Sequence, residues 1–283
     1  MSEKVIGIIG GSGLYEMEGL KNVKEVKVKT PFGNPSDAYI IGKLGDVKMV
    51  FLPRHSRGHK LLPTELNYRA NIFGMKKLGV EWIISVSAVG SMREDIKPGH
   101  IVIPDQFFDR TKARPNTFFG KGIVGHVEFA DPVCHDLSGI LFNAGKELNI
   151  TVHKGGTYIC IEGPQFSTRA ESKIYRKWGV DVIGMTNIPE AKLAREAEIC
   201  YATLALSTDY DCWHETEESV SVEMILETIK NNVANAKAII KRAVQKIEGA
   251  RKCKCASAMK YAIVTDKKVI PAKVKKDLKP LIG

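Results

Sequence analysis

Residues 162–213 read EGPQFSTRAESKIYRKWGVDVIGMTNIPEAKLAREAEICYATLALSTDYDCW, in which helical patterns alternate with apolar runs. The helical patterns cover Thr168–Trp178 and Pro189–Ala197, where Pro189 suits a first helical turn. The apolar runs Val180–Met185 and Ile199–Leu206 are bounded by turn residues and indicate buried strands. Helices that alternate with strands in this way predict an α/β fold.

The same alternation continues over the rest of the chain. Further apolar runs indicate strands at Val5–Ile9, Ala38–Ile41, Val47–Leu52, Trp82–Val86, Ile101–Ile103 and Thr157–Ile161. Helical patterns cover Thr64–Leu78, with Thr64 as its cap, about Asp136–Leu148, and a long amphipathic stretch at Val220–Glu248. We therefore expect a single α/β domain with a mixed, largely parallel central β-sheet flanked by helices. Such folds bind their ligands at the carboxyl ends of the strands.

The composition fits one large domain followed by a basic extension. The chain has 283 residues, of which 44% are hydrophobic, and no repeat or linker divides the first 250 positions. Residues 250–283 hold ten Lys or Arg against two Asp, which gives this segment a net charge of +8 out of the total of +10. We expect a catalytic domain over residues 1–249 and a solvated, partly ordered extension over residues 250–283. No RNA-binding signature with interleaved aromatic residues accompanies the basic segment, so no nucleic-acid partner is expected.

The sequence also bears on location and on thiol chemistry. No leader with a basic region, an apolar core and a cleavage site is recognisable, and no apolar run approaches the length of a membrane span. We expect a soluble, cytoplasmic protein without a membrane partner. The cysteines lack the CxxC spacing of a zinc site, so we expect reduced thiols and no metal. Disulfides remain an alternative, between Cys253 and Cys255 or between Cys134 and Cys200.

Two carboxylates follow the buried strand that is predicted at Ile199–Leu206. Asp209 and Asp211 stand where this strand meets a loop, at the place where an α/β fold presents ligand-binding groups. A carboxylate there can face the ring nitrogens of a purine, and Phe166 can lie against the face of the base. Taken alone, the two acidic residues fit a solvated turn at least equally well.

Three other predicted strand ends carry groups that suit a phosphate. Gly10–Gly13 offers backbone N–H groups and the hydroxyl of Ser12, although it lacks the GxGxxG and Gly-Lys-Ser/Thr patterns, and a plain β-turn fits it about as well. Arg54 and His55 place a planar guanidinium beside an imidazole, which suits two-oxygen recognition, with a solvated basic loop as the alternative. Ser87–Ser91 reads as another small-residue turn. Together these segments predict an enzyme that acts on a nucleoside.

Longer blocks of the sequence resemble a known family. The block HKLLPTELNYRANIFGMKKLGVEWIISVSAVGSM at 59–92 is similar to the signature of the trimeric purine nucleoside phosphorylase and methylthioadenosine phosphorylase family. Similar blocks cover nearly everything from residue 5 to about 245: IGIIGGSGLYE, TPFGNPSDA, PRHSRGH, REDIKPGHIVIPDQFFDRT, IEGPQFSTRAES, GMTNIPEAKLAREAEICYA and TDYDCW. The last block favours the branch that acts on 5′-methylthioadenosine. The resemblance implies a nucleoside phosphorylase-like fold, a homotrimer or a dimer of trimers, and no cofactor, with inorganic phosphate as co-substrate.

The resemblance also implies roles for particular residues. Phosphate would be held by Ser12, Arg54, His55, Ser87, the backbone of Ala88 and Thr186. The base and ribose would contact Phe166, Ser167 and Met185, and the purine edge would face the catalytic residues Asp209 and Asp211. His126 would reach across a subunit boundary toward the 5′ end of the substrate. Val222 and Ile225 lie three residues apart on one helix face and would present an apolar wall to a methylthio group, with ordinary helix core as the alternative.

This set of groups predicts phosphorolysis of 5′-methylthioadenosine to adenine and 5-methylthioribose 1-phosphate, a pentosyl transfer of purine and methionine salvage. The transition state is oxocarbenium-like, and Asp209 would stabilise the departing base through a shared proton. A carboxylate accepts a hydrogen bond from a 6-amino group, whereas a 6-oxo base would oppose two acceptors, so adenine is favoured. The alternatives are a broader purine nucleoside phosphorylase acting on adenosine, inosine or guanosine, and a nucleotide- or RNA-binding protein without turnover.

Overall fold

The centre of the fold is strand β5 (Trp82–Ser91), at which a large β-sheet branches. The computed structural model describes residues 3–214 and 222–283, without the side chains of Ser12 and of residues 222–226. On one side β5 pairs in parallel with β1 (Val5–Gly10), and on the other it pairs in parallel with β11 (Cys200–Asp209) and antiparallel with β10 (Val182–Gly184). Every residue of β1 is buried, because its apolar run is covered on both faces of the sheet.

The other strands extend this branched sheet in both directions. One path runs in the order β2-β3-β4-β1-β5-β10-β9-β7, and β11, β6 and β8 branch off at β5. The remaining bounds are β2 (Leu20–Val26), β3 (Tyr39–Leu44), β4 (Val47–Pro53), β6 (Ile101–Ile103), β7 (Gln106–Arg110), β8 (Val152–Lys154) and β9 (Thr157–Ile161). Parallel pairs predominate, and the predicted single α/β domain with a mixed, largely parallel sheet is confirmed.

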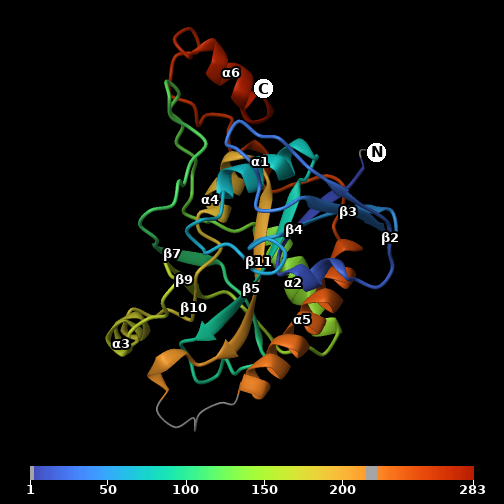
Figure 1. The fold of residues 1–283 in the computed structure, drawn as a ribbon, viewed down its shortest axis with the longest axis vertical. Coiled ribbons are helices and arrows are strands. Elements are labelled where there is room, and N and C mark those ends of the chain that lie inside the picture. The colour runs from blue at the N-terminus through green and yellow to red at the C-terminus, as the bar shows by residue number, and fades with distance from the viewer. Residues whose placement is uncertain (1–2, 215–221) are drawn as a thin grey trace.

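Helices cover both faces of the sheet (Figure 1). Helices α1 (Tyr68–Lys77) and α4 (Glu190–Glu196) contribute to one hydrophobic core, and α2 (His135–Glu147) and α5 (Val222–Val244) contribute to a second. Helix α3 (Arg169–Lys177) packs separately, against Trp213. None of these helices, within the described residues, has an apolar stretch long enough to span a bilayer.

Several predicted boundaries were wrong. Helix α1 begins at Tyr68 rather than at Thr64, and its cap is Asn67, whose Oδ1 accepts a hydrogen bond from the backbone N–H of Ala70 at 3.1 Å. Residues Ser87–Ser91 are not a turn, because β5 continues through them and pairs there with β10. Strand β2 was missed because its residues LKNVKEV are mostly exposed and do not alternate in polarity.

The C-terminal extension is packed, which corrects the expectation of a solvated terminus. It contains a helix, α6 (Ala272–Ile282), whose Leu278 and Leu281 are buried in the first core cluster. It also pairs with residues 118–126, because the backbone N–H of His126 donates to the Ala262 carbonyl at 2.8 Å. In Figure 1 this red helix stands at the end of the molecule beside the green segment. The apolar residues between the lysines supply this packing, while most of the cations stay exposed.

Candidate active site

The carboxyl ends of β1, β4, β5 and β11 open into a cavity of about 850 Å³. Pockets for small organic ligands have volumes of roughly 300 to 1,000 Å³, so the cavity is of a suitable size. It is lined by ten of the residues that the sequence singled out: Arg54, His55, Ser87, Ala88, Phe166, Ser167, Met185, Thr186, Asp209 and Asp211. The fold therefore gathers groups from segments that are far apart in the sequence.

Four predicted site residues lie outside this group of ten: Ser12, His126, Val222 and Ile225. Gly11 and Gly13 line the cavity, whereas the side chain of Ser12 lies outside the described part of the structure. His126 does not line the cavity of its own chain, and instead belongs to the segment that pairs with the C-terminal extension. The predicted role of His126 requires a second copy of the chain and stays a prediction.

The apolar wall predicted on α5 lies partly beyond the described side chains. Those of Val222 and Ile225 are among the side chains that are not described. Further along the same helix, Ile229, Asn232 and Val233 line the cavity. The helix therefore does face the site with apolar residues, one to two turns after the predicted positions.

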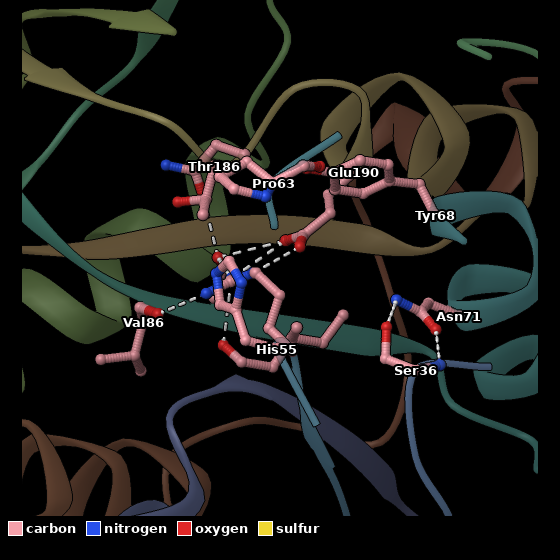
Figure 2. Close-up of polar contacts among 12 residues, drawn as sticks. Ser36, His55, Pro63, Tyr68, Asn71, Val86, Thr186 and Glu190 are labelled. Carbon is pink, nitrogen blue, oxygen red and sulfur yellow. Dashed lines mark hydrogen bonds and ion pairs between the residues drawn. The ribbon is translucent and has the colours of Figure 1, made fainter. Parts of the chain in front are cut away.

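Arg54 forms a buried ion pair at the cavity. Its Nε lies 2.5 Å from Glu190 Oε1 and its Nη2 lies 3.1 Å from Glu190 Oε2, and the two side chains are 3% and 0% exposed. Nη1 donates to the Val86 carbonyl at 2.9 Å, and Nη2 donates to Ser85 Oγ at 2.7 Å. In Figure 2, Glu190 and Val86 approach the region around His55 from different elements. Burial lowers the pKa of Arg54, but the charge of Glu190 outweighs it and leaves the pKa above the usual range.

This pairing corrects the prediction that Arg54 presents a planar pair of donors to a phosphate. The fork of the guanidinium is turned toward Glu190, and the hydrogen bonds occupy four of its five N–H groups, leaving one on Nη1. The physical reason is that a charge buried this deeply requires a counter-charge. Arg54 therefore contributes one donor at most, and its main effect is to fix the ends of β1 and β5.

Glu190 belongs to a buried polar network that the sequence analysis missed. The hydroxyl of Tyr201 lies 2.8 Å from Asn187 Oδ1 and 3.0 Å from Glu190 Oε2, and its single proton is donated to one of these acceptors at a time. Asn187 Oδ1 also accepts from Ser85 Oγ at 2.8 Å. These side chains come from α4, the loop before it, the start of β11 and the first half of β5, so the network ties α4 and its loop to the two central strands. The helical pattern at Pro189–Ala197 gave no sign that Glu190 is buried.

His55 is oriented by a backbone bond. Its Nδ1 lies 2.8 Å from the Leu61 carbonyl, and its ring stacks on that of His59 at 4.4 Å between centroids. Burial lowers the pKa of His55 to about 4, and the neighbouring charge of Arg54 acts in the same direction. The neutral ring must carry its proton on Nδ1 to make this bond, so Nε2 is an acceptor. A second donor from His55 toward phosphate therefore requires the protonated ring, and this predicted role stays a prediction.

The segment that follows His55 is held in place by two hydrogen bonds. The hydroxyl of Tyr68 donates to the Pro63 carbonyl at 2.7 Å. The backbone N–H of Arg57 donates to Asp37 Oδ2 at 2.8 Å, and the Arg57 side chain pairs with the same carboxylate. Burial raises the pKa of Asp37, but the bonds from Arg57 outweigh it and lower the pKa to about 2. Arg57 thus holds this segment to Asp37 at the surface and does not line the cavity.

Two hydroxyl groups face the cavity between β5 and β10. Ser87 is 7% exposed, and its Oγ has no hydrogen-bond partner of good geometry, although the Tyr158 hydroxyl is its neighbour. Thr186 is 7% exposed, and its Oγ1 lies 3.3 Å from the same hydroxyl. A buried hydroxyl without a partner is costly, so a ligand oxygen that pairs with Ser87 would remove that cost.

The two carboxylates are fixed by their neighbours. Asp209 Oδ2 accepts a hydrogen bond from Thr208 Oγ1 at 2.7 Å, and Asp209 Oδ1 accepts one from the backbone N–H of Asp211 at 2.8 Å. Ser167 Oγ lies 3.0 Å from Asp211 Oδ2. Gly90 runs so close that a Cβ added there would lie 2.9 Å from Asp209 Oδ1. Both acidic residues are therefore held in place and do not form a freely solvated turn.

Another part of the cavity is apolar and open, in contrast to the part that is lined by carboxylates and hydroxyl groups. Phe166 lines the cavity and is 85% exposed, which is unusual for a phenyl ring and leaves its face available to a planar ligand. Met185 lines the cavity next to Gly163, where an added Cβ would lie 2.5 Å from its Sδ. Arg114, which the sequence analysis also missed, donates to the carbonyls of Met185 and Glu162 at 2.9 and 2.7 Å. It thereby ties together the two segments that carry Met185 and Phe166.

Known proteins resemble this chain over its whole length. Residues 5–245 match the model of the phosphorylase superfamily. A relative from Geobacter sulfurreducens, named S-methyl-5′-thioadenosine phosphorylase, is 68% identical over 282 residues, which are 99% of either chain. A solved methylthioadenosine phosphorylase from an antarctic soil metagenomic library has a TM-score of 0.96 at 50% identity and covers 100% of both chains. One from Schistosoma mansoni, solved in complex with adenine, has a TM-score of 0.83 at 40% identity and covers 90% of this chain and 96% of its own.

Proposed function

The chain belongs to the phosphorylase superfamily, and we propose that its cavity catalyses the phosphorolysis of 5′-methylthioadenosine to adenine and 5-methylthioribose 1-phosphate. The observation that carries the proposal is the meeting of two sets of groups in one cavity. Fixed carboxylates lie at the end of β11, and hydroxyl groups and an imidazole lie at the ends of β4, β5 and β10. Proteins that are similar over the full chain are named for this reaction.

The phosphate would be bound by hydroxyl and N–H groups more than by net charge. The charge of Arg54 is balanced by Glu190, so Arg54 contributes its remaining Nη1 donor. Ser87 and Thr186 supply hydroxyl groups, and the neutral His55 offers Nε2 as an acceptor. An acceptor at this place suits the P–OH group of a monoprotonated phosphate. Phosphate fixed in this way would attack the anomeric carbon and stabilise the positive charge that develops there.

The base would be bound between Phe166 and the carboxylates. The open face of Phe166 supports stacking of a purine. Asp209 and Asp211 have fixed oxygens, and an acidic acceptor favours a 6-amino group over a 6-oxo group. Sharing of a proton between Asp209 and a ring nitrogen would stabilise the base as the glycosidic bond breaks. Ser167 holds Asp211 and thereby fixes the direction of the pair.

The 5′ substituent would lie near α5. Ile229 and Val233 of this helix line the cavity and give its wall an apolar character, which suits a methylthio group. Val222 and Ile225 would extend this wall, and His126 of a second copy would contribute to it from across a subunit boundary. The proposal includes a homotrimer or a dimer of trimers, a cytoplasmic location in purine and methionine salvage, and no cofactor or nucleic-acid partner.

A comparison of substrates tests the proposed specificity. Purified protein is supplied with phosphate and with equal concentrations of 5′-methylthioadenosine, adenosine, inosine or guanosine, and the release of each base is followed. We expect kcat/KM for 5′-methylthioadenosine to exceed that for inosine by at least about a hundredfold, because a mismatched 6-substituent leaves polar groups unpaired in the site. A preference for inosine or guanosine would support the broader purine nucleoside phosphorylase instead.

A further inference from the structure

Four cysteines that are scattered in the sequence meet in the structure, away from the active site. They are Cys134, Cys200, Cys253 and Cys255, and their sulfur atoms all lie within 4.8 Å of one another. Three are buried, and Cys253 is half-buried. They come from the N-terminus of α2, the first residue of β11 and the C-terminal extension. The sequence analysis expected no metal because the CxxC spacing is missing, and it missed this cluster because the fold brings the ligands together.

The spacing of the sulfur atoms suits a tetrahedral metal centre. Zinc binds thiolates at about 2.3 Å, which puts the sulfur atoms of a tetrahedral site about 3.8 Å apart. The distance between Cys200 Sγ and Cys253 Sγ is 3.3 Å, which is shorter than the tetrahedral spacing. All four sulfur atoms lie within 4.8 Å of one another, a limit that is longer than the tetrahedral spacing. Small rotations of the side chains are enough to place all four sulfur atoms around one ion.

A helix end and two chain neighbours bring positive charge toward the cluster. Cys134 occupies the N-cap position of the 13-residue helix α2, whose positive end stabilises a negative sulfur. Lys252 and Lys254 flank Cys253 in the chain, and a tetrathiolate site around a divalent ion carries a charge of about −2 that such cations offset.

The cluster can be reached from solvent. Cys134 and Cys253 line a second cavity of about 460 Å³, together with Trp82, Ile247 and Arg251. Among the described residues, this cavity shares no lining residue with the active-site cavity. An ion can thus be bound and removed here without passing through the proposed substrate site.

We propose that Cys134, Cys200, Cys253 and Cys255 form a structural site for a thiophilic divalent cation, zinc above all. Binding replaces four S–H bonds by four metal–sulfur bonds and releases four protons. The ion would tie the C-terminal extension to α2 and to β11. Since the extension also pairs with residues 118–126, the ion would stabilise the segment that carries His126 as well.

The test uses the full-length protein, reduced, freed of metal and then titrated with zinc or cobalt. We expect about one equivalent of either ion per chain, the absorption bands of a tetrahedral cobalt thiolate complex, and a melting temperature that rises with zinc and falls again with a chelator. Folded, reduced protein that binds no zinc would overturn the proposal. The proposal would also be overturned if the four cysteines resist alkylation because they form disulfides, and if the protein binds no zinc after these disulfides are reduced.

Variants identify the ligands. Cys253→Ser is the first choice because Cys253 is only half-buried, and Cys255→Ser is the second. Each should weaken zinc binding by more than about tenfold, because the loss of a residue that only hydrogen-bonds to a metal ligand already costs about that much. Cys212→Ser is the matched control, because Cys212 is exposed and lies outside the cluster, and it should bind zinc like the parent protein. Equal zinc binding by all three variants would contradict the assignment of the ligands.

Discussion

Glu190 lies behind Arg54 at the cavity, and the 2.5 Å contact between Arg54 Nε and Glu190 Oε1 is one of the most buried ion pairs of the described chain. A free guanidinium is the usual partner of a bound anion, yet the charge of Arg54 is balanced by Glu190 inside the protein. The pair therefore acts first on the structure of the site, by joining the ends of β1 and β5 to α4. In the proposed reaction, any effect of Arg54 on phosphate would follow from that positioning.

Glu190→Ala should be strongly destabilising because it leaves Arg54 buried without a counter-charge. We expect a loss of about 3 to 5 kcal/mol in the free energy of unfolding. Denaturant unfolding measures it, with Glu147→Ala as the control. Glu147 pairs with Arg242 and Lys246 on the surface, where solvent screening makes an ion pair contribute little to stability. Equal losses in the two variants would contradict a structural role for the buried pair.

Asp209→Asn should separate chemistry from phosphate binding. The amide keeps the shape of the side chain but cannot share a proton with the departing base, so kcat should fall by roughly 10²- to 10⁴-fold. The KM for phosphate should change only a few-fold, because Asp209 lies at the end of β11 and not among the phosphate groups. Steady-state kinetics with varied phosphate gives both values. A raised KM with little change in kcat would mean that Asp209 binds rather than catalyses.

Gly90→Ala should displace the carboxylate of Asp209, because the two residues are in close contact. The added Cβ would lie 2.9 Å from Asp209 Oδ1, a distance at which one of the two must move. We expect a fall in kcat with a folded protein. Gly139→Ala is the control, since a Cβ there meets nothing within 4 Å and alanine suits the helix. Unchanged turnover in Gly90→Ala would show that the position of Asp209 is not critical.

His55 should make the protein less stable as the pH falls from 6.5 to 4. Its pKa is about 4 in the folded chain, against 6.5 for the free side chain, so the unfolded chain takes up the proton first. The stability that depends on the neutral ring is complete above pH 6.5 and is lost as the pH falls through the folded pKa. Allowing for the partial exposure of His55, we expect a loss of about 1 to 2 kcal/mol. Urea unfolding of the parent and of His55→Gln in phosphate-free buffer measures it, and identical pH dependence would refute the prediction.

His126 gives a test of subunit sharing. It does not line the cavity of its own chain, so a role at the substrate requires a neighbouring copy. Subunits that carry His126→Ala and subunits that carry Asp209→Ala should be nearly inactive separately. After unfolding and mixed refolding, sites with an intact Asp209 and a neighbour's intact His126 should recover part of the activity. Absence of any recovery in mixed oligomers would argue for sites that are complete within one chain.

The sequence predicted most of the fold because its buried elements are strongly apolar. Strands such as β1 and β6 were found within a residue or at their observed bounds. Elements without such a pattern were missed: the mostly exposed β2, and α6, whose apolar residues are spaced among lysines. The helix boundary at Asn67 was also missed, because a capping bond depends on backbone geometry that spacing alone does not give.

The candidate site was predicted less completely than the fold. Residues at strand ends, such as Asp209 and Arg54, could be named because an α/β sheet places those ends together. The partners that set their chemistry could not. Glu190 looks like an exposed helix residue, and nothing in the sequence indicated that Nδ1 of His55 is bound to the Leu61 carbonyl. The four-cysteine cluster was hidden for the same reason, since long-range packing creates it.

The most direct test of the proposed reaction is the phosphate dependence of adenine release from 5′-methylthioadenosine by the purified protein. We expect adenine and 5-methylthioribose 1-phosphate in equal amounts, and no adenine when phosphate is left out. Adenine release at the same rate without phosphate, with free methylthioribose as the second product, would contradict phosphorolysis, and failure to release any base would contradict the enzyme itself.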